Sequence, residues 1–202
     1  MRMILVDRDG VINKDPGGWT KYSYVMDWED FHFLPGALEA LRLLKVNGIK
    51  VVVISNQAGV NKGYFSRQAL DQIDRKMSEE IRKSGGKIEE SFYCVHRDED
   101  NCNCRKPKTG LIEAAVKKYG IDLNDTYFIG DGKMDVMTGK RMGIKTIFVL
   151  SGKTSRNAMR ESGLRPNYVF KDFLEAVKWI IDKRKRKTDR ALKRQKDKET
   201  GS

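Results

Sequence analysis

The sequence contains little cysteine, histidine or proline and no long hydrophobic run. It has three cysteines, two histidines and four prolines in 202 residues, and the odd number of cysteines argues against a disulfide framework. Its longest apolar runs, at 51–54 and 146–150, are far shorter than the roughly 20 residues of a membrane-spanning helix. From Met1 the sequence leads directly into a predicted strand, without an apolar signal region. We therefore expect no membrane span and a cytoplasmic location.

The composition is that of a folded domain with a strongly basic end. The chain is 39% hydrophobic and 34% charged, and its net charge is +12 at pH 7. Residues 183–199 contain ten Lys/Arg and three Asp/Glu, which contribute +7 of that total. We divide the chain into a domain over 1–182 and a basic tail over 183–202, helical or disordered. The tail is either a solvated extension of the last helix or a surface that binds phosphate backbones or other anions.

Short apolar runs alternate with segments of helical periodicity along the whole domain. The predicted strands span residues 3–6, 49–55, 88–95, 126–130, 145–150 and 168–170. The predicted helices span residues 35–48, 66–84, 109–119 and 133–142, and a last helix begins at 172. This alternation indicates an α/β fold with a parallel sheet covered by helices on both faces. In such folds, ligands bind beyond the carboxyl ends of the strands.

Acidic residues follow two of the predicted strands. Asp7 and Asp9 come directly after the first strand, and Asp131 and Asp135 follow a later one. Carboxylates gathered at one sheet edge repel each other unless a cation binds between them, and Mg²⁺ prefers such oxygen ligands. For Asp135 a second interpretation stays open, because a carboxylate in the first turn of a helix is favoured by the helix N-terminus.

This inventory suits phosphoryl transfer. One carboxylate can be a nucleophile through an aspartyl-phosphate, while a second acts first as an acid and then as a base. The transferred group also needs cations and hydrogen-bond donors around its oxygens. Lys106 is a suitable cation, and Ser55 with Asn56 follows the second strand.

All three cysteines and one histidine lie within eleven residues. Cys94, His96, Cys102 and Cys104 offer three thiolates and one imidazole, a ligand set suited to tetrahedral Zn²⁺. Because four protein ligands leave no open position, we expect a structural zinc ion that orders the polar loop 97–103. The alternative is three buried thiols beside a surface histidine.

Four segments resemble the motifs of a known family in the right order. They are "DRDGVIN" from residue 7, "SNQAGV" from 55, "CRKPKTG" from 104 and "GDGKMD" from 130. They are similar to the four motifs of the haloacid-dehalogenase superfamily of phosphatases, and the resemblance covers about residues 3 to 152. The similarity is closest to the branch of heptose 1,7-bisphosphate 7-phosphatases, with histidinol-phosphatases as its sister. It implies a Rossmann-like fold with a minimal cap, because the gaps between motifs are short.

The resemblance also implies roles for individual residues. Asp7 is expected to be the nucleophile and Asp9 the general acid and base. Mg²⁺ is expected to bind Asp7, Asp131 and the backbone carbonyl of Asp9. The same branch carries the Cys-x-His…Cys-x-Cys loop, which supports the zinc prediction.

Further positions are implied for phosphate and substrate. Ser55 and Lys106 are expected to contact the transferred phosphoryl group, and Asp135 to orient Lys106 or a metal-bound water. Pro107 should stiffen the exit of the zinc loop, so that the loop directs Arg105 toward the phosphate site. The implied substrate-binding residues are Asp15, Asn56, Gln57, Arg105 and Lys106.

Two departures from the branch concern the substrate rather than the chemistry. The segment 15–31 is long and aromatic, and its tyrosines and tryptophans either form a wall of the substrate site or pack the loop onto the domain. Gly132 stands where the branch usually has a lysine, and Lys133 comes one position later.

The expected protein is thus a monomeric, Mg²⁺-dependent phosphomonoesterase that removes the C7 phosphate of a heptose 1,7-bisphosphate. A histidinol-phosphatase or a less selective phosphatase is the alternative within the same chemistry. A nucleic-acid 3′-end phosphatase that uses the basic tail as a clamp is a further alternative. An inactive binding protein is disfavoured, because it would not need both Asp7 and Asp9.

Overall fold

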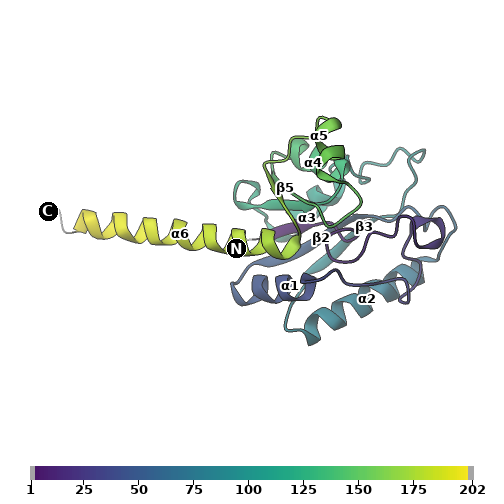
Figure 1. The fold of residues 1–202 in the computed structure, drawn as a ribbon, viewed down its shortest axis with the longest axis horizontal. Coiled ribbons are helices and arrows are strands. Elements are labelled where there is room, and N and C mark those ends of the chain that lie inside the picture. Colours follow the sequence, from purple (N-terminus) through teal and green to yellow (C-terminus); the bar gives the residue numbers. More distant parts are fainter. Residues whose placement is uncertain (1–2, 200–202) are drawn as a thin grey trace.

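A computed structural model describes residues 3–199 of the chain, with side chains described as far as Arg190. Six strands form one sheet in the order β3-β2-β1-β4-β5-β6 (Figure 1). The strands are β1 Met3–Val6, β2 Lys50–Asn56, β3 Glu90–Cys94, β4 Tyr127–Gly130, β5 Lys145–Val149 and β6 Tyr168–Phe170. Every neighbouring pair is parallel, as predicted. All six carboxyl ends therefore lie at the same edge of the sheet.

Helices connect the strands and cover both faces of the sheet. They are α1 Ala37–Val46, α2 Arg67–Lys83, α3 Gly110–Tyr119, α4 Lys133–Arg141, α5 Arg156–Glu161 and α6 Phe173–Glu199. Alternate residues of β1 face opposite sides. Ile4 and Val6 pack with residues of α1, α2 and α6, while Met3 and Leu5 pack with residues of α3. Burial on both faces explains why the central strands are continuous apolar runs in the sequence.

The predicted order of elements is confirmed, with boundary differences of one or two residues. The short helix α5 and two 3₁₀ turns, at 21–23 and 123–125, were not predicted. The segment that contains α5 has only one buried apolar side chain, Met159, and therefore carries no helical pattern of apolar residues. No helix in the described part of the chain is both long and apolar enough to cross a membrane.

The last helix, α6, passes without interruption through the predicted boundary between residues 182 and 183. Its first turns bury Phe173, Val177 and Ile180 against the sheet and α1, with which it makes extensive contact. Its later turns project away from the rest of the molecule (Figure 1). The division of the chain at residue 182 stays a prediction.

Candidate active site and metal centre

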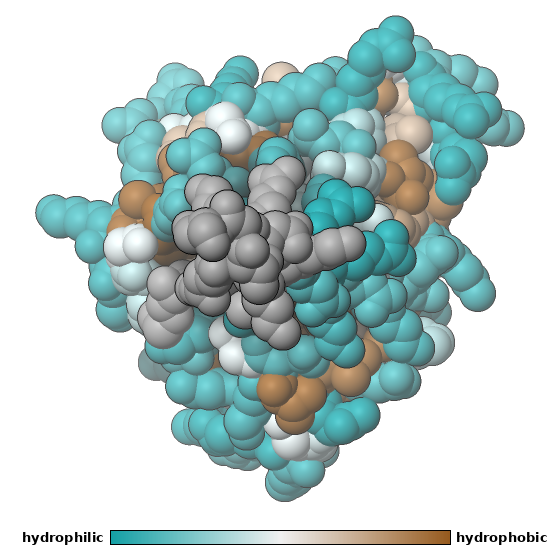
Figure 2. Space-filling view, turned by 90° about the vertical axis from the view of Figure 1, so that its left-hand side faces the viewer, coloured by the Kyte–Doolittle hydropathy of each residue, from teal (hydrophilic) through white to brown (hydrophobic). Residues whose placement is uncertain are grey.

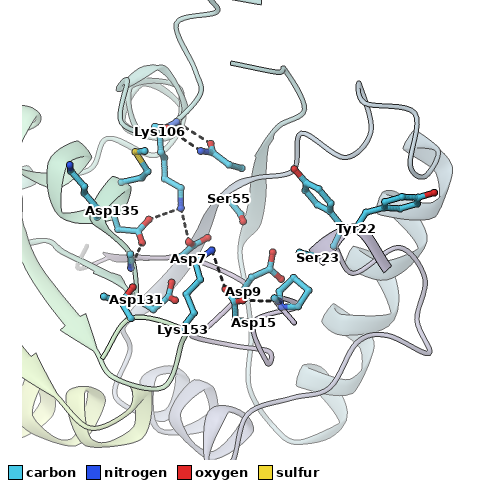
Figure 3. Close-up of a pocket in the computed structure, with 18 of the residues that line it drawn as sticks. Asp7, Asp9, Asp15, Tyr22, Ser23, Ser55, Lys106, Asp131, Asp135 and Lys153 are labelled. Atoms are coloured by element: carbon cyan, nitrogen blue, oxygen red, sulfur yellow. Dashed lines mark hydrogen bonds and ion pairs between the residues drawn. The ribbon is translucent and has the colours of Figure 1, made fainter. Parts of the chain in front are cut away.

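The carboxyl edge of the sheet holds a cavity of about 610 Å³. Asp7 follows β1, Ser55 and Asn56 end β2, and Asp131 follows β4; all four line the cavity. Figure 3 shows Asp7 between Lys106, Asp131 and Ser55. The other described residues that line the cavity are Asp9, Asp15, Pro16, Gly17, Tyr22, Ser23, Tyr24, Lys62, Tyr64, Lys106, Gly132, Lys133, Met134, Asp135, Lys153 and Thr154.

A tight turn after β1 places Asp7 and Asp131 beside each other. Three backbone N–H groups, from Val11, Ile12 and Asn13, donate to the carbonyl of Arg8. Gly10 adopts a φ of 78°, and a Cβ there would lie 2.4 Å from Cγ of Asp131. The close approach of the two acidic loops therefore depends on a glycine at this position.

Lys106 is the central cation of the site. It is only 4% exposed, and its Nζ lies 2.8 Å from Oδ2 of Asp7 and 2.6 Å from Oδ1 of Asp135. Nζ also donates to the carbonyl of Ile54 at 2.9 Å. Burial alone would lower the pKa of Lys106, but the carboxylates of Asp135 and Asp7 outweigh it and raise the pKa. The amine is therefore charged and held in one position.

Asn56 holds the backbone of Lys106 from the neighbouring strand. Its Oδ1 accepts from the Lys106 N–H at 3.0 Å, and its Nδ2 donates to the Lys106 carbonyl at 3.1 Å. Because both backbone groups are bound by one side chain, the lysine enters the site at a defined angle. Asn56 was predicted as a substrate contact; it lines the cavity and also has this positioning contact.

The acidic cluster has the character of a cation site. Oxygens of Asp7, Asp131 and Asp135 lie within 4.8 Å of one another. Burial raises the pKa of Asp7 to about 6, against the lowering effect of Lys106. Burial, followed by the charges of Asp135 and Asp7, also raises the pKa of Asp131 well above its usual range. Oδ2 of Asp131 is buried without a hydrogen-bond partner, so the residues present fit Mg²⁺, which binds such oxygens.

Asp9 is bound differently from the other carboxylates. Arg8 donates to it through Nε at 3.1 Å and Nη2 at 3.2 Å, and Asn13 Nδ2 donates at 2.9 Å. Burial would raise the pKa of Asp9, but the Arg8 guanidinium and these hydrogen bonds outweigh it and lower the pKa. Arg8 itself is completely buried. Arg8 was not among the predicted site residues, although its place between Asp7 and Asp9 in the sequence was a usable signal.

The structure does not bring two of the predicted substrate contacts to the cavity. Gln57 is fully buried and donates from Nε2 to Asp9 at 2.8 Å and to Ser55 Oγ at 3.2 Å. Arg105 donates from Nε to Asp98 at 2.7 Å, because the loop 97–103 offers a carboxylate nearby. Neither is among the described residues that line the cavity. Gln57 instead supports Asp9 and Ser55 from behind.

The long aromatic loop divides into two parts. Trp28 stacks on Phe31 at 5.0 Å and packs against the core. Tyr22 instead stacks on Tyr64 at 4.3 Å, and both line the cavity with Tyr24. Both interpretations of this loop thus describe a part of it.

Positive charge surrounds the mouth of the cavity. Lys62, Lys133 and Lys153 are all lining residues, and none was predicted as a site residue. Lys153 Nζ lies 3.8 Å from Oδ2 of the predicted substrate contact Asp15. Lys62 and Lys153 lie in loops and Lys133 begins α4, so the three have no recognisable spacing, and only their spatial convergence indicates a common role.

The three cysteines and His96 form a compact cluster next to the cavity. The Sγ atoms of Cys94 and Cys102 are 3.7 Å apart, and those of Cys104 and Cys102 are 3.5 Å apart. His96 Nδ1 lies 3.7 Å from Cys94 Sγ and 3.3 Å from Cys104 Sγ. Ligand bonds of about 2.3 Å give a tetrahedron with edges of about 3.7 Å, so this donor set fits Zn²⁺.

The cysteine–histidine cluster is connected to the cavity through a short segment. Cys104 precedes Lys106 by two residues, and the N–H of Gly110 donates to the carbonyl of Asn103 at 3.0 Å. On the other side, Arg141 Nη1 donates to the carbonyl of Pro107 at 2.7 Å. A fixed cluster therefore limits where Lys106 can lie.

Known proteins are similar to this chain in sequence and in fold. A family model described as HAD-hydrolase-like matches residues 103–176. The D-glycero-β-D-manno-heptose-1,7-bisphosphate 7-phosphatase of Neisseria meningitidis serogroup A is 33% identical over 183 residues, which cover 90% of this chain and 95% of that protein. The protein of the same name from Helicobacter pylori strain 26695 is 36% identical over 150 residues, or 74% and 83% of the two chains.

A solved structure supports the same relationship. The D,D-heptose 1,7-bisphosphate phosphatase of B. bronchiseptica, in complex with magnesium and phosphate, has a TM-score of 0.84 and 29% identity. The match covers 91% of this chain and 99% of that one. These comparisons confirm the family and fold expected from the four motifs. The chain belongs to the heptose-bisphosphate phosphatases of the haloacid-dehalogenase superfamily.

Proposed function

We propose that the protein is a Mg²⁺-dependent phosphomonoesterase that removes the C7 phosphate of D-glycero-D-manno-heptose 1,7-bisphosphate. The observation that carries the proposal is the convergence of Asp7, Asp131 and Lys106 in one cavity with an unpartnered, buried carboxylate oxygen. The names of the relatives support the choice of sugar. A monomeric state and a cytoplasmic location stay predictions of the sequence analysis.

The reaction begins with attack by a carboxylate oxygen of Asp7 on phosphorus. The bond from phosphorus to the C7 oxygen breaks, and Asp9 gives its proton to that oxygen. Asp9 then takes a proton from water, which attacks the aspartyl-phosphate and releases inorganic phosphate. Mg²⁺ at Asp7 and Asp131, with the Asp9 backbone carbonyl, would neutralise charge on the phosphoryl oxygens.

Asp9 needs a proton before the first step. In the structure the Arg8 guanidinium holds its pKa low. A phosphate dianion arriving beside Asp9 is a like charge and raises the pKa of Asp9, which favours uptake of that proton. After the alcohol leaves, the contacts from Arg8 and Gln57 favour the ionised form that activates water.

Ser55 and Lys106 bind the phosphoryl group in this scheme. Ser55 Oγ accepts a hydrogen bond from Gln57 Nε2 at 3.2 Å, so the hydroxyl hydrogen is available for a phosphoryl oxygen. Lys106 contributes a fixed positive charge beside Asp7. Lys62, Lys133 and Lys153 at the mouth of the cavity offer cations for the second phosphate of a bisphosphate.

Phosphate release from a substrate panel tests the proposal. The panel contains heptose 1,7-bisphosphate, fructose 1,6-bisphosphate, histidinol phosphate and a 3′-phosphorylated oligonucleotide, each with and without Mg²⁺. We expect the heptose ester to have the highest kcat/KM and Asp7→Asn to abolish its turnover. A preference for another ester would refute the heptose assignment and retain the chemistry. Absence of release from every ester would refute both.

A further inference from the structure

Helix α6 leaves the body of the molecule after Ile181. Ile180 and Ile181 are buried, whereas all described side chains from Asp182 to Arg190 are exposed except the half-buried Arg184. At 1.5 Å per residue, the segment from 183 to 199 extends about 25 Å. This segment, which we call the projecting helix, is visible at the left of Figure 1.

The described side chains of the projecting helix, from Lys183 to Arg190, are mostly cations and include no apolar residue. Residues 183–190 contain six Lys/Arg and one acidic residue, Asp189. No ion pair among the described residues involves Lys185, Arg186, Lys187 or Arg190. Between Ile181 and Ala191 the sequence has no apolar residue. A helical segment without an apolar stripe does not pack into a core or insert into a lipid surface, so a partner that binds residues 183–190 must be polar and negatively charged.

The base of the projecting helix is firmly attached to the body. Lys183 Nζ lies 4.4 Å from the ring centre of Trp179 and 4.8 Å from that of Tyr168, whose hydroxyl accepts from it at 3.0 Å. Arg184 Nη1 donates to the carbonyl of Asn47, which caps α1. The first charges of the segment are therefore held in fixed positions relative to the sheet.

The positive surface continues onto the body. A groove of about 260 Å³ lies beside the base of the helix. Four of its lining residues are cations, namely Lys145, Lys183, Arg184 and Lys187. Figure 2 shows that the face around the end of α6 is mostly hydrophilic, with separate small apolar patches. The groove and helix form one basic surface.

This basic surface lies at the sheet edge opposite to the catalytic cavity. Tyr127 and Lys145 begin β4 and β5, whereas Asp131 directly follows the carboxyl end of β4. Four residues of strand separate the two edges by about 13 Å, and the helix projects away from the rest of the molecule (Figure 1). The helix therefore does not present its ligand to Asp7.

We propose that the projecting helix and its groove bind the phosphate backbone of double-helical DNA and tether the phosphatase to it. A helix of about 10–12 Å diameter matches a major groove about 12 Å wide. Lys185, Arg186, Lys187 and Arg190 project to several sides of the helix, and duplex DNA carries a phosphate charge about every 1.7 Å, so a helix in the groove can meet phosphates of both strands. Release of counterions then drives binding without sequence specificity.

The test measures binding of a fluorescent 20-base-pair DNA duplex to the full chain between 50 and 200 mM salt. The variant replaces Lys185, Arg186, Lys187 and Arg190 by Gln, which preserves helix propensity. Each phosphate contact contributes about −0.9 to the slope of log affinity against log salt, so the slope should become shallower by about 3 to 4. Heptose-bisphosphate turnover should not change.

A matched control separates position from net charge. It replaces four exposed cations elsewhere, Arg75, Lys117, Lys140 and Arg160, by Gln. We expect this control to bind DNA like the wild type. Equal losses of duplex affinity in the two variants would overturn the proposal. So would absence of duplex binding by the wild type, or binding only to anionic lipid vesicles. Competition between the duplex and the sugar substrate would also overturn it, because the two sites would then coincide.

Discussion

The two edges of the sheet differ in how far their charged groups are buried. At the carboxyl edge, the buried Lys106 is paired with the half-buried Asp7 and the buried Asp135. At the amino edge, charged groups such as Lys118 and Lys187 are exposed to solvent. A buried charge without its partner is costly, whereas an exposed charge is solvated whether or not it is paired. Substitutions at the carboxyl edge should therefore have much larger effects than substitutions at the amino edge.

The largest effect is expected for Asp7→Asn. The amide keeps the shape of the side chain but cannot form an aspartyl-phosphate, so kcat should fall by at least about a thousandfold. Phosphate release under saturating heptose bisphosphate measures it. The exposed Asp27→Asn is the matched control and should be fully active. A variant of Asp7 that retains most of its turnover would show that another group is the nucleophile.

Cys104→Ser takes one of the four donors from the predicted zinc site, and it should loosen the segment that carries Lys106. A loss of a few kcal/mol lowers the melting temperature by roughly 10 °C in a domain of this size, and kcat should fall with it. Calorimetry and the zinc content of the purified protein provide the two readouts. Asn103→Ser, in the same loop, should change neither. The zinc assignment fails if wild-type protein binds no zinc.

A smaller effect is expected for Arg8→Lys. The substitution keeps the positive charge and replaces the fork-shaped contact to Asp9 by a single donor, so kcat should fall about tenfold while KM stays constant. Arg67→Lys changes an exposed arginine that is paired with Asp71 at 3.0 Å and should have no effect. A change in KM alone would indicate that Arg8 acts on substrate binding instead.

The smallest effect is expected at the amino edge, for Glu90→Gln. Burial would raise the pKa of Glu90, but hydrogen bonds from Lys118 and Tyr119 outweigh it and lower the pKa. A lowered folded-state pKa stabilises the protein above the unfolded-state pKa, and this contribution disappears as the pH falls through the folded-state pKa.

The expected difference in unfolding free energy between Glu90→Gln and wild type is below about 1 kcal/mol at pH 7. This difference should diminish from about pH 5 downwards, where the wild-type carboxylate becomes protonated and is then neutral like the glutamine. Urea denaturation at several pH values measures it, with the exposed Glu161→Gln as control. A difference of several kcal/mol would contradict the contrast between the edges.

The predictable parts of the site are the polar residues that come directly after a strand in the sequence. Asp7 and Asp131 come next to buried apolar runs, and parallel strands bring their carboxyl ends to the same edge. The four zinc-type ligands were equally clear, because they are clustered in a chain that has few such residues. In both cases local order along the sequence carries the information.

The support of the site was not predictable in this way. Arg8 and Gln57 are of residue types that usually lie at the surface or bind substrate, yet both are buried around Asp9. Arg105 donates a hydrogen bond to Asp98 and does not line the cavity. These outcomes depend on which partner is nearest in space, a property that neither residue type nor spacing contains.

The sequence by itself determined the alternation of strands and helices, the acidic and thiolate motifs and the basic end of the chain, because each depends on neighbours along the chain. Only the tertiary structure decided that Arg8 and Gln57 surround Asp9, that Arg105 pairs with Asp98, and that the basic helix leaves from the opposite edge. Charge interactions depend on distance and burial, and both are set by how distant segments pack.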